Sequence, residues 1–194
     1  MAGAVNAVFA VGRHGEFALS DGSLPWRTVA SLEADARRDM EHFKRLTAGC
    51  AVVMGFGTYR TLPRPLVGRL NVVIDRNAHN AERTAHDTQG APLDAHRAPL
   101  ELSAQGEECF YFLPTLQAAL TALRTLPVRV FLIGGKRLFE CAFSSGLVDG
   151  TVYQTVFDAT FPQATVFFAL PGGLELQKSE RVGRLTFSEY KVRR

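Results

Sequence analysis

The stretch FLIGGKRLF, residues 131–139, joins an apolar run to two glycines and then to a pair of basic residues. The apolar run begins at Val128 and predicts a buried strand, whereas the residues after the glycines predict a helix that ends near Phe143. Glycines let a ligand approach the backbone, and the start of a helix attracts phosphate. The pattern is also typical of a plain strand-to-helix turn, so the stretch by itself leaves both interpretations open.

A second stretch, VVMGFGTYRTL at residues 52–62, repeats this arrangement. A predicted strand over residues 51–54 meets Gly55 and Gly57, and Thr58 is placed to cap a short helix. Two strands that end in glycines within one parallel sheet suit a dinucleotide, because ligands bind at the carboxyl ends of such strands. The G-x-G-x-x-G fingerprint is absent, so the sequence does not indicate a Rossmann site.

Around these stretches, strands and helices alternate along the chain. The predicted strands are 5–11, 51–54, 70–74, 109–113, 128–133 and 148–157, and the predicted helices are 31–48, 55–62, 115–124 and 135–143. This alternation predicts an α/β fold with a largely parallel, right-handed sheet. Two more strands, 174–182 and 185–192, predict an antiparallel C-terminal edge. Residues 12–30, which hold three glycines, a proline and a tryptophan, predict a long structured loop.

The length of 194 residues suits one domain with a sizeable core, and we expect residues 1–194 to form it. Residues 77–108 are polar and show no lasting period. A structureless loop of this length is uncommon inside a compact domain, so we expect a surface insertion there.

The charge pattern argues against nucleic acid and membranes as partners. The net charge is only +3, and the chain contains no block of five or six like charges. The N-terminal apolar run is too short for a signal peptide or a membrane span. We therefore expect a soluble, cytoplasmic protein, and anionic small molecules are compatible with its charge.

The cysteines and histidines give no sign of a disulfide framework or a metal site. Cys50, Cys109 and Cys141 are far apart, form no C-x-x-C pair and lie in or beside apolar runs. This favours buried thiols in a reducing compartment. All five histidines are expected to be solvated, and no metal is expected.

The predicted helix over residues 31–48 carries one unusual acid. Met40, Phe43 and Leu46 recur at a spacing of three and form its apolar stripe. Asp39 lies four residues before Phe43 and seven before Leu46, which places its carboxylate on the same stripe. A buried carboxylate is costly unless it is paired, so this position calls for a partner. Ser31 is expected to cap the start of the helix.

Two further residues allow more than one interpretation. Trp26, in LPWR at residues 24–27, is either a local packing anchor or part of a lid over a pocket. Arg69, just before a predicted strand, is either a surface arginine or a guanidinium that pairs with a ligand carboxylate.

Taken in order, these pieces resemble dihydrofolate reductase. The matching stretches are LPW (24–26), DMEHFKRLT (39–47), VVMGFGTY (52–59), RPLVGRLNVVI (64–74), FLIGGKRLF (131–139) and TVF (155–157). Their order and spacing agree with the family, and with the flanking strands they span nearly the whole chain. The resemblance implies a mostly parallel eight-stranded sheet flanked by helices. It also implies reduction of 7,8-dihydrofolate to tetrahydrofolate by NADPH, sensitivity to methotrexate and a monomeric state.

The resemblance also assigns roles to residues. Asp39 aligns with the acid that holds the pterin and supports protonation of N5, Thr155 with the threonine that hydrogen-bonds this acid, and Trp26 with the lid tryptophan. The substrate pocket is expected to be lined by Val8, Phe9, Met40, Phe43, Leu62, Leu66 and Ile133, and Arg69 to bind the α-carboxylate of the glutamate tail. The cofactor groove is expected to hold Ala10, Leu19, Gly55, Thr58, Arg76, Gly134, Gly135, Lys136, Arg137, Leu138 and Phe139.

Several positions depart from the family. The segment between Trp26 and Asp39 is longer, and SLEADARRD predicts about two extra turns of helix. Ala18–Leu19 replaces the Ile-Gly that touches nicotinamide, and Phe139 replaces a tyrosine. Ala164 replaces an aspartate that helps to hold the lid closed. We therefore expect slower turnover than in a typical member.

The cofactor pocket departs as well. Phe56 and Gly57 replace basic residues near the 2′-phosphate, and Asp75 stands beside the ribose, where an acid can accept from a 2′-hydroxyl. Arg76 and the basic residues after Gly135 favour NADPH, which is the expected cofactor, with NADH as the alternative. Two other functions stay open: a reductase of the same fold for another pterin or pyrimidine, and a paralogue that binds folate without catalysis.

Overall fold

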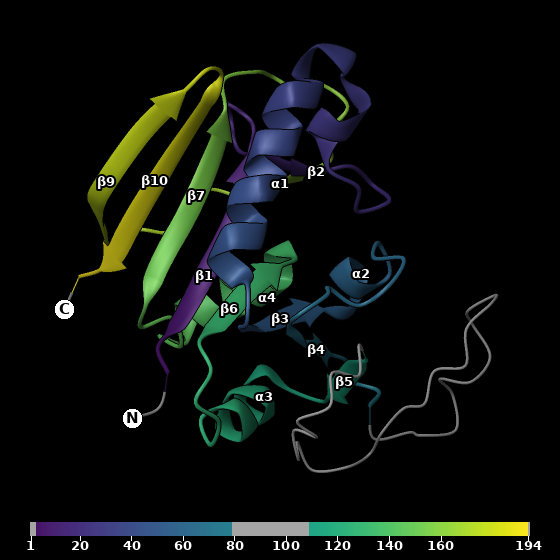
Figure 1. The fold of residues 1–194 in the computed structure, drawn as a ribbon, viewed down its shortest axis with the longest axis vertical. Helices are drawn as coiled ribbons and strands as arrows, with labels where there is room; N and C mark the ends of the chain where they lie inside the picture. Colours follow the sequence, from purple (N-terminus) through teal and green to yellow (C-terminus); the bar gives the residue numbers. More distant parts are fainter. Residues whose placement is uncertain (1–2, 79–108, 194) are drawn as a thin grey trace.

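The computed structural model describes residues 3–78 and 109–193, which form one eight-stranded sheet flanked by helices and a small two-stranded sheet (Figure 1). In spatial order the large sheet contains β5 (Phe110–Leu113), β4 (Leu70–Ile74), β3 (Ala51–Gly55), β6 (Val130–Gly134), β1 (Val5–Val11), β7 (Thr151–Phe157), β10 (Leu185–Val192) and β9 (Leu174–Val182). The helices are α1 (Glu33–Thr47), α2 (Phe56–Tyr59), α3 (Leu116–Leu123) and α4 (Lys136–Ser144), and η1 (Pro25–Thr28) and η2 (Ala30–Leu32) are 3₁₀ turns.

The strands from β5 to β7 in this order are parallel, and β10 runs antiparallel to both β7 and β9. This confirms the predicted α/β fold with an antiparallel C-terminal edge. The predicted strand over 148–157 starts later, at Thr151, because Gly150 is still in a turn and donates its N–H to the carbonyl of Val5. Of the predicted insertion over 77–108, only residues 77 and 78 fall within the described residues.

Side chains alternate along β1 and divide the core between the two faces of the sheet. Phe9 belongs to the cluster that contains Leu120 of α3 and Phe139 of α4, whereas Val8 belongs to the cluster against which Phe43 of α1 packs. Figure 1 shows α1 lying along the sheet in front of β1 and β7. The carboxyl end of β1 therefore lies between the two helical layers.

The start of α1 differs from the prediction. Leu32 is the N-cap residue and makes no side-chain cap, and Ser31 is exposed in the preceding η2 turn. The backbone explains why no serine is needed, because the N–H groups of Leu32 and Glu33 already donate to the carbonyls of Val29 and Ala30. The prediction of Ser31 as N-cap is wrong.

The predicted extension of this helix is confirmed, since α1 begins at Glu33 and places about 1.7 turns ahead of Asp39. The extra turns contact the turn between β9 and β10. A Cβ added at Gly183 would lie 3.3 Å from Asp35 Oδ1 and 3.4 Å from an Arg38 nitrogen. The extension is therefore held by the antiparallel edge of the sheet.

The loop after β1 contains regular structure that the sequence did not reveal. β2 (Glu16–Ala18) pairs antiparallel with β8 (Val166–Phe167), and together they form the small sheet. Both strands are short, and neither shows enough alternation to be recognised on its own.

Two surface predictions need correction. Cys50 is buried as predicted, but Cys141 is exposed because α4 buries Leu138 and Ala142 instead. His42 is half-buried rather than solvated, because its ring packs 4.5 Å from that of Phe187.

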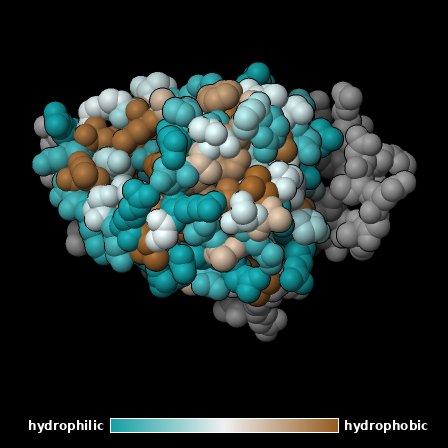
Figure 2. Space-filling model, turned by 90° about the horizontal axis from the view of Figure 1, so that it is seen from above, coloured by the Kyte–Doolittle hydropathy of each residue, from teal (hydrophilic) through white to brown (hydrophobic). Residues whose placement is uncertain are grey.

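In the part of the chain that the structure describes, the exposed large hydrophobic side chains come from different segments: Phe56, Val67, Phe167, Leu176 and Val192. On the face shown in Figure 2, hydrophobic residues lie in small groups among hydrophilic ones. No helix in the described ranges is both long and apolar enough to cross a membrane.

Candidate active site

Asp39 lies on the buried side of α1 and is only 8% exposed. Burial raises the pKa of its carboxyl to about 6, and a hydrogen bond from the Thr155 side chain on β7 opposes part of that rise. The predicted pairing of Asp39 with Thr155 is therefore present. A carboxyl with this pKa exchanges its proton close to neutral pH, which suits it for proton transfer and for binding a cationic or hydrogen-donating ring.

Two aromatic rings pack against Trp26, which lies in η1. Its ring stacks 4.5 Å from that of Phe157 and lies 5.9 Å from that of Phe161. The tryptophan is 2% exposed, yet it borders a cavity of about 390 Å³ that Leu24 and Met40 also line. Trp26 is thus a packing anchor, as one of the two interpretations has it, and also lines a cavity. Its role in a lid stays a prediction.

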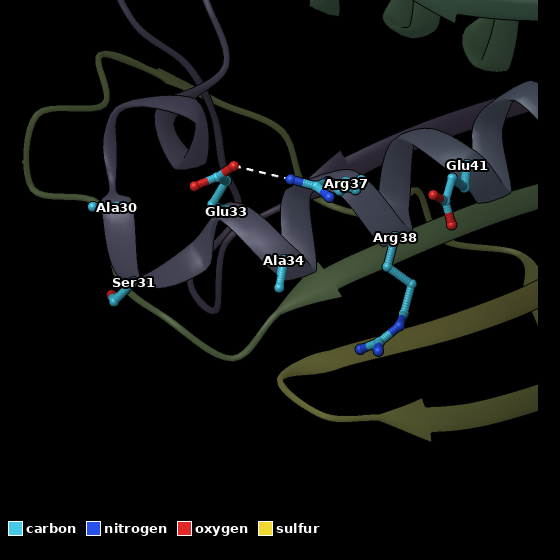
Figure 3. A pocket seen from close by; sticks show the side chains of 7 residues that line it. All are labelled: Ala30, Ser31, Glu33, Ala34, Arg37, Arg38 and Glu41. Atoms are coloured by element: carbon cyan, nitrogen blue, oxygen red, sulfur yellow. Dashed lines mark hydrogen bonds and ion pairs between the residues drawn. The ribbon is translucent and has the colours of Figure 1, made fainter.

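A second hollow, of about 490 Å³, lies on the outer side of the α1 extension (Figure 3). It is lined by Ala30, Ser31, Glu33, Ala34, Arg37, Arg38 and Glu41. The exposed ion pair between Glu33 and Arg37, at 3.0 Å, crosses it. Neither Asp39 nor Trp26 lines this hollow, so we do not assign the reaction to it.

Most of the predicted substrate residues meet on the α1 side of the sheet. One apolar cluster contains Val8, and the half-buried side chains of Phe43, Leu62, Leu66 and Ile133 pack against it. Half-buried apolar side chains grouped in this way can still contact a ring placed against them.

Phe9 does not join that group. Its ring packs 5.3 Å from Phe139 and 5.0 Å from Phe168, in the cluster on the α4 side of the sheet. Strand alternation forces this separation from Val8. Phe9 therefore lies on the side of the sheet where the cofactor groove is expected, next to the phenylalanine that replaces the family tyrosine.

Arg69 lies beside this substrate group. Its guanidinium carbon is 5.7 Å from the centre of the Phe43 ring, and its Nε is buried with no hydrogen-bond partner among the described residues. Burial also lowers the pKa of Arg69. A buried donor without a partner is costly, so this nitrogen is suited to a ligand carboxylate.

Asn71 holds the loop that carries Arg69, a role that no pattern in the sequence indicated. Its Nδ2 donates to the carbonyls of Leu66 (3.0 Å) and Arg69 (2.9 Å), and its Oδ1 accepts from the N–H of Leu66 (2.9 Å). The residue is fully buried. An asparagine at the second position of a predicted strand could have been noticed only as a polar residue within an apolar run.

The glycines of the expected cofactor groove lie together because β3 and β6 are neighbours. Met54 pairs with Gly134 across these strands. A Cβ added at Gly55 would lie 3.8 Å from Gly134 O and Gly135 N, and one added at Gly134 or Gly135 would lie 3.4 Å from Thr58 Oγ1. Gly134 has a φ of +121°, which glycine adopts far more readily than other residues. These glycines thus bring backbone together at the carboxyl ends of two parallel strands, where the cofactor groove is expected.

The other predicted cofactor residues are distributed around this groove. Leu138 and Phe139 are buried in α4, Lys136 pairs with Glu140 at 3.6 Å, and Arg137 is exposed. Ala10 and Leu19 lie apart from these four. Ala10 packs against the cluster that contains Trp26, and the N–H of Leu19 donates to Ser23 O.

Asp75 and Arg76 follow β4, the neighbour of β3, at the same edge. Gly55 pairs with Ile74, so the residues after both strands are close. Asp75 is buried, and its Oδ1 accepts from the N–H of Asn77 at 3.0 Å, whereas Arg76 and Phe56 are exposed. This carboxylate therefore stabilises a turn, and its second oxygen makes no hydrogen bond with the described residues.

Comparison with known proteins agrees with this arrangement. A family model for dihydrofolate reductase matches residues 20–101. The chain is 31% identical over 168 residues to the dihydrofolate reductase type 3 of Salmonella typhimurium, a match that covers 86% of this chain and 81% of that relative. The chain belongs to the dihydrofolate reductase family. The dihydrofolate reductase of Mycobacterium leprae is 30% identical over 125 residues, which cover 63% of this chain and 55% of that relative.

The fold agrees with that of solved dihydrofolate reductases. The dihydrofolate reductase from Enterococcus faecalis complexed with NADP(H) and RAB-propyl superposes with a TM-score of 0.70, covering 98% of this chain and 97% of the other. The two sequences are only 18% identical, so this likeness concerns the fold. The extended α1, Phe139 and Ala164 remain features of this chain within the dihydrofolate reductase family.

Proposed function

We propose that this chain reduces 7,8-dihydrofolate to tetrahydrofolate, with NADPH as the hydride donor. The proposal rests on one observation: two buried groups that can bind a ligand, the carboxylate of Asp39 and the Nε of Arg69, lie on the same side of the sheet. A folate has a pterin at one end and a glutamate carboxylate at the other. The pair therefore supports folate over a pterin or pyrimidine that lacks the tail.

Asp39 has two tasks in this proposal. Its carboxylate accepts hydrogen bonds from N3–H and the 2-amino group of the pterin, and the side chain of Thr155 keeps it oriented. Because the pKa of Asp39 is raised to about 6, the residue can also supply the proton that reaches N5, with Trp26 helping to place a water near the ring. Phe43, Leu66 and the other apolar side chains around Val8 exclude bulk water from the ring system.

The glycines at the ends of β3 and β6 support a dinucleotide as the second ligand, because glycines let a ligand approach the backbone and such ligands bind at the carboxyl ends of parallel strands. When bound, the nicotinamide supplies the hydride. Phe9 and Phe139 pack beside the expected cofactor groove and give the transfer an apolar setting. Phe139 offers no hydroxyl there, which supports slower turnover than with tyrosine.

The decisive experiment follows the loss of reduced-nicotinamide absorbance with dihydrofolate, in parallel with NADPH and with NADH. We expect turnover that methotrexate inhibits and that Asp39→Asn lowers at least about a hundredfold without loss of the fold. Near-normal turnover in Asp39→Asn would remove Asp39 from the mechanism. Methotrexate binding without turnover by the folded wild-type protein would instead indicate a non-catalytic folate binder.

The cofactor preference depends on Asp75. Asp75→Ser removes a negative charge beside the expected 2′-phosphate, and a serine hydroxyl can still accept from the N–H of Asn77. We expect the ratio of kcat/KM for NADPH to that for NADH to rise about tenfold. The substitution Glu175→Gln, at an exposed position on β9, is the matched control for the removal of a negative charge. An unchanged ratio would show that Asp75 only stabilises the turn at Asn77 and does not affect the cofactor preference.

A further inference from the structure

A buried carboxylate joins the loop after β1 to the loop after β7. Glu16, the first residue of β2, is 4% exposed. Its Oε2 accepts a hydrogen bond of 2.8 Å from the N–H of His14, and its Oε1 accepts one of 3.2 Å from the N–H of Phe161. A single side chain therefore binds a backbone group in its own loop and one that is 145 residues away from it in the sequence.

The contact is made by the charged form of the acid. Burial opposes ionisation of Glu16, yet the backbone N–H groups of Glu16, His14 and Phe161 together hold the pKa of its carboxyl below the ordinary value. An ionised acceptor bonded to backbone N–H groups makes stronger hydrogen bonds than a neutral one. The link is thus suited to fix the position of Phe161 at neutral pH.

The position of Phe161 matters because its ring packs against Trp26 of the candidate active site. The ring is 1% exposed and lies 5.9 Å from Trp26 and 6.4 Å from Phe157, which itself stacks on Trp26. Trp26 in turn borders the cavity next to Met40. A continuous set of contacts therefore runs from Glu16 through Phe161 to Trp26.

The other links between these two loops differ in kind. Arg13 and Asp158 form an ion pair of 2.7 Å with side chains 54% and 36% exposed, where water weakens it. The backbone bond from Arg13 N–H to Ala159 O, at 2.9 Å, does not depend on side-chain identity. Ala164 offers no polar side chain. Within the described residues, Glu16 is thus the buried side chain that links the two loops by hydrogen bonds.

We propose that Glu16 is a positioning residue that holds Phe161 and, through the Phe161 ring, sets the placement of Trp26 in the active site. The effect on Trp26 is independent of what the enzyme does. The consequence for turnover rests on the proposed function.

Two substitutions should disturb the contact between Glu16 and Phe161, one by changing the carboxylate and the other by crowding it. Glu16→Gln keeps the shape but sets an amide NH₂ against one of the two N–H donors. Gly12→Ala keeps the carboxylate, but its Cβ would lie 2.6 Å from Glu16 Oε2 and 2.6 Å from a ring carbon of Phe161, so the two must move. Glu175→Gln and Gly172→Ala are matched controls, because Glu175 is exposed and a Cβ at Gly172 meets nothing within 4 Å.

The readout is the fluorescence of Trp26, the only tryptophan in the chain. We expect both substitutions to raise the acrylamide quenching constant about twofold and to lower kcat about tenfold, while both controls behave like wild type. Unchanged quenching in folded Glu16→Gln and Gly12→Ala proteins would overturn the proposal. Increased quenching with unchanged kcat would overturn the link from Trp26 to the reaction.

Amide hydrogen exchange of the wild-type protein tests the same link without any substitution. The N–H of Phe161 should exchange far more slowly than that of the exposed neighbour Gln163. Equal rates would overturn the proposal even if the variants failed to fold. A wild-type protein that lacks reductase activity but shows the expected quenching and exchange would contradict the proposed function and leave the role of Glu16 intact.

Discussion

Asp39 lies on the buried stripe of α1, where an ionised carboxylate is less stable than in water. Its pKa rises from an ordinary value of 3.8 to about 6 on folding. Between these two pH values the folded state binds the proton more tightly than the unfolded state does. The contribution of Asp39 to stability therefore falls as the pH rises through this window and stays low above it.

Removing the charge should show this cost. We expect Asp39→Asn to raise the free energy of unfolding by roughly 2–3 kcal/mol at pH 7.5 and by much less at pH 4, as a shift of about two pKa units predicts. Urea denaturation at both pH values measures the effect, with Glu175→Gln as the control. An equal effect of Asp39→Asn at both values would show that burial does not perturb Asp39.

Arg69 should decide between ligands with and without a glutamate tail. Arg69→Gln removes the guanidinium whose buried Nε has no partner among the described residues. We expect the Kd for methotrexate to rise about a hundredfold, as the loss of a charge-assisted pair of hydrogen bonds predicts, and that for a diaminopyrimidine without the tail to change little. Arg64→Gln, an exposed position in the same loop, is the matched control. Equal weakening of both ligands would mean that Arg69 does not contact the tail.

At the scale of elements, short loops carry the site and buried polar side chains hold them. Asn71 fixes the loop before β4 with three hydrogen bonds, and Glu16 joins the loop after β1 to the loop before β8 with one hydrogen bond to each. The extended start of α1 is held differently, by contacts with the turn at Gly183. These supports explain how irregular segments present Trp26 and Arg69 in defined positions.

The clamp by Asn71 can be tested with a nearly isosteric change. Asn71→Asp keeps an acceptor for the N–H of Leu66 but sets a second carboxylate oxygen against the carbonyls of Leu66 and Arg69. We expect a loss of about 2–4 kcal/mol in the free energy of unfolding at pH 7.5, because a charge is buried with one donor while its second oxygen faces two carbonyls. Asn77→Asp, at an exposed position, is the control. A loss below about 0.5 kcal/mol would show that this loop holds its shape without Asn71.

At the scale of the whole molecule, the two groups of site residues lie on either side of the central strand β1. The glycines of the groove follow β3 and β6, and Asp39 contacts β7 on the other side of β1. A ligand that bridges α1 and the sheet should therefore stabilise the fold as a unit.

Thermal unfolding measures this coupling. Methotrexate at about 1,000 times its Kd should add about 4 kcal/mol, which for a chain of 194 residues corresponds to a rise in Tm of roughly 8–16 °C. NADPH should raise the Tm further when both are present. A Tm that stays constant at saturating methotrexate would contradict folate binding.

The sequence by itself determined the class of the fold, and it predicted the site residues that the proposed function uses. Apolar runs that alternate with helical patterns predicted the strands, and the apolar stripe of α1 identified Asp39 as a charge at a position that should be buried. Both signals arise from residues only a few positions apart in the sequence. The helix cap at Ser31 was wrong and β2 and β8 were missed, because backbone bonds from η2 and pairing between distant segments override local preference.

Only the tertiary structure decided which side chains meet. It brought Thr155 to Asp39, left the Nε of Arg69 with no hydrogen-bond partner among the described residues and joined Glu16 to Phe161. Each of these relations depends on the register of strands or on contacts between segments far apart in the chain. Local periodicity reports which face of an element is buried, but the partner on the other side of that face is fixed only when the whole chain packs.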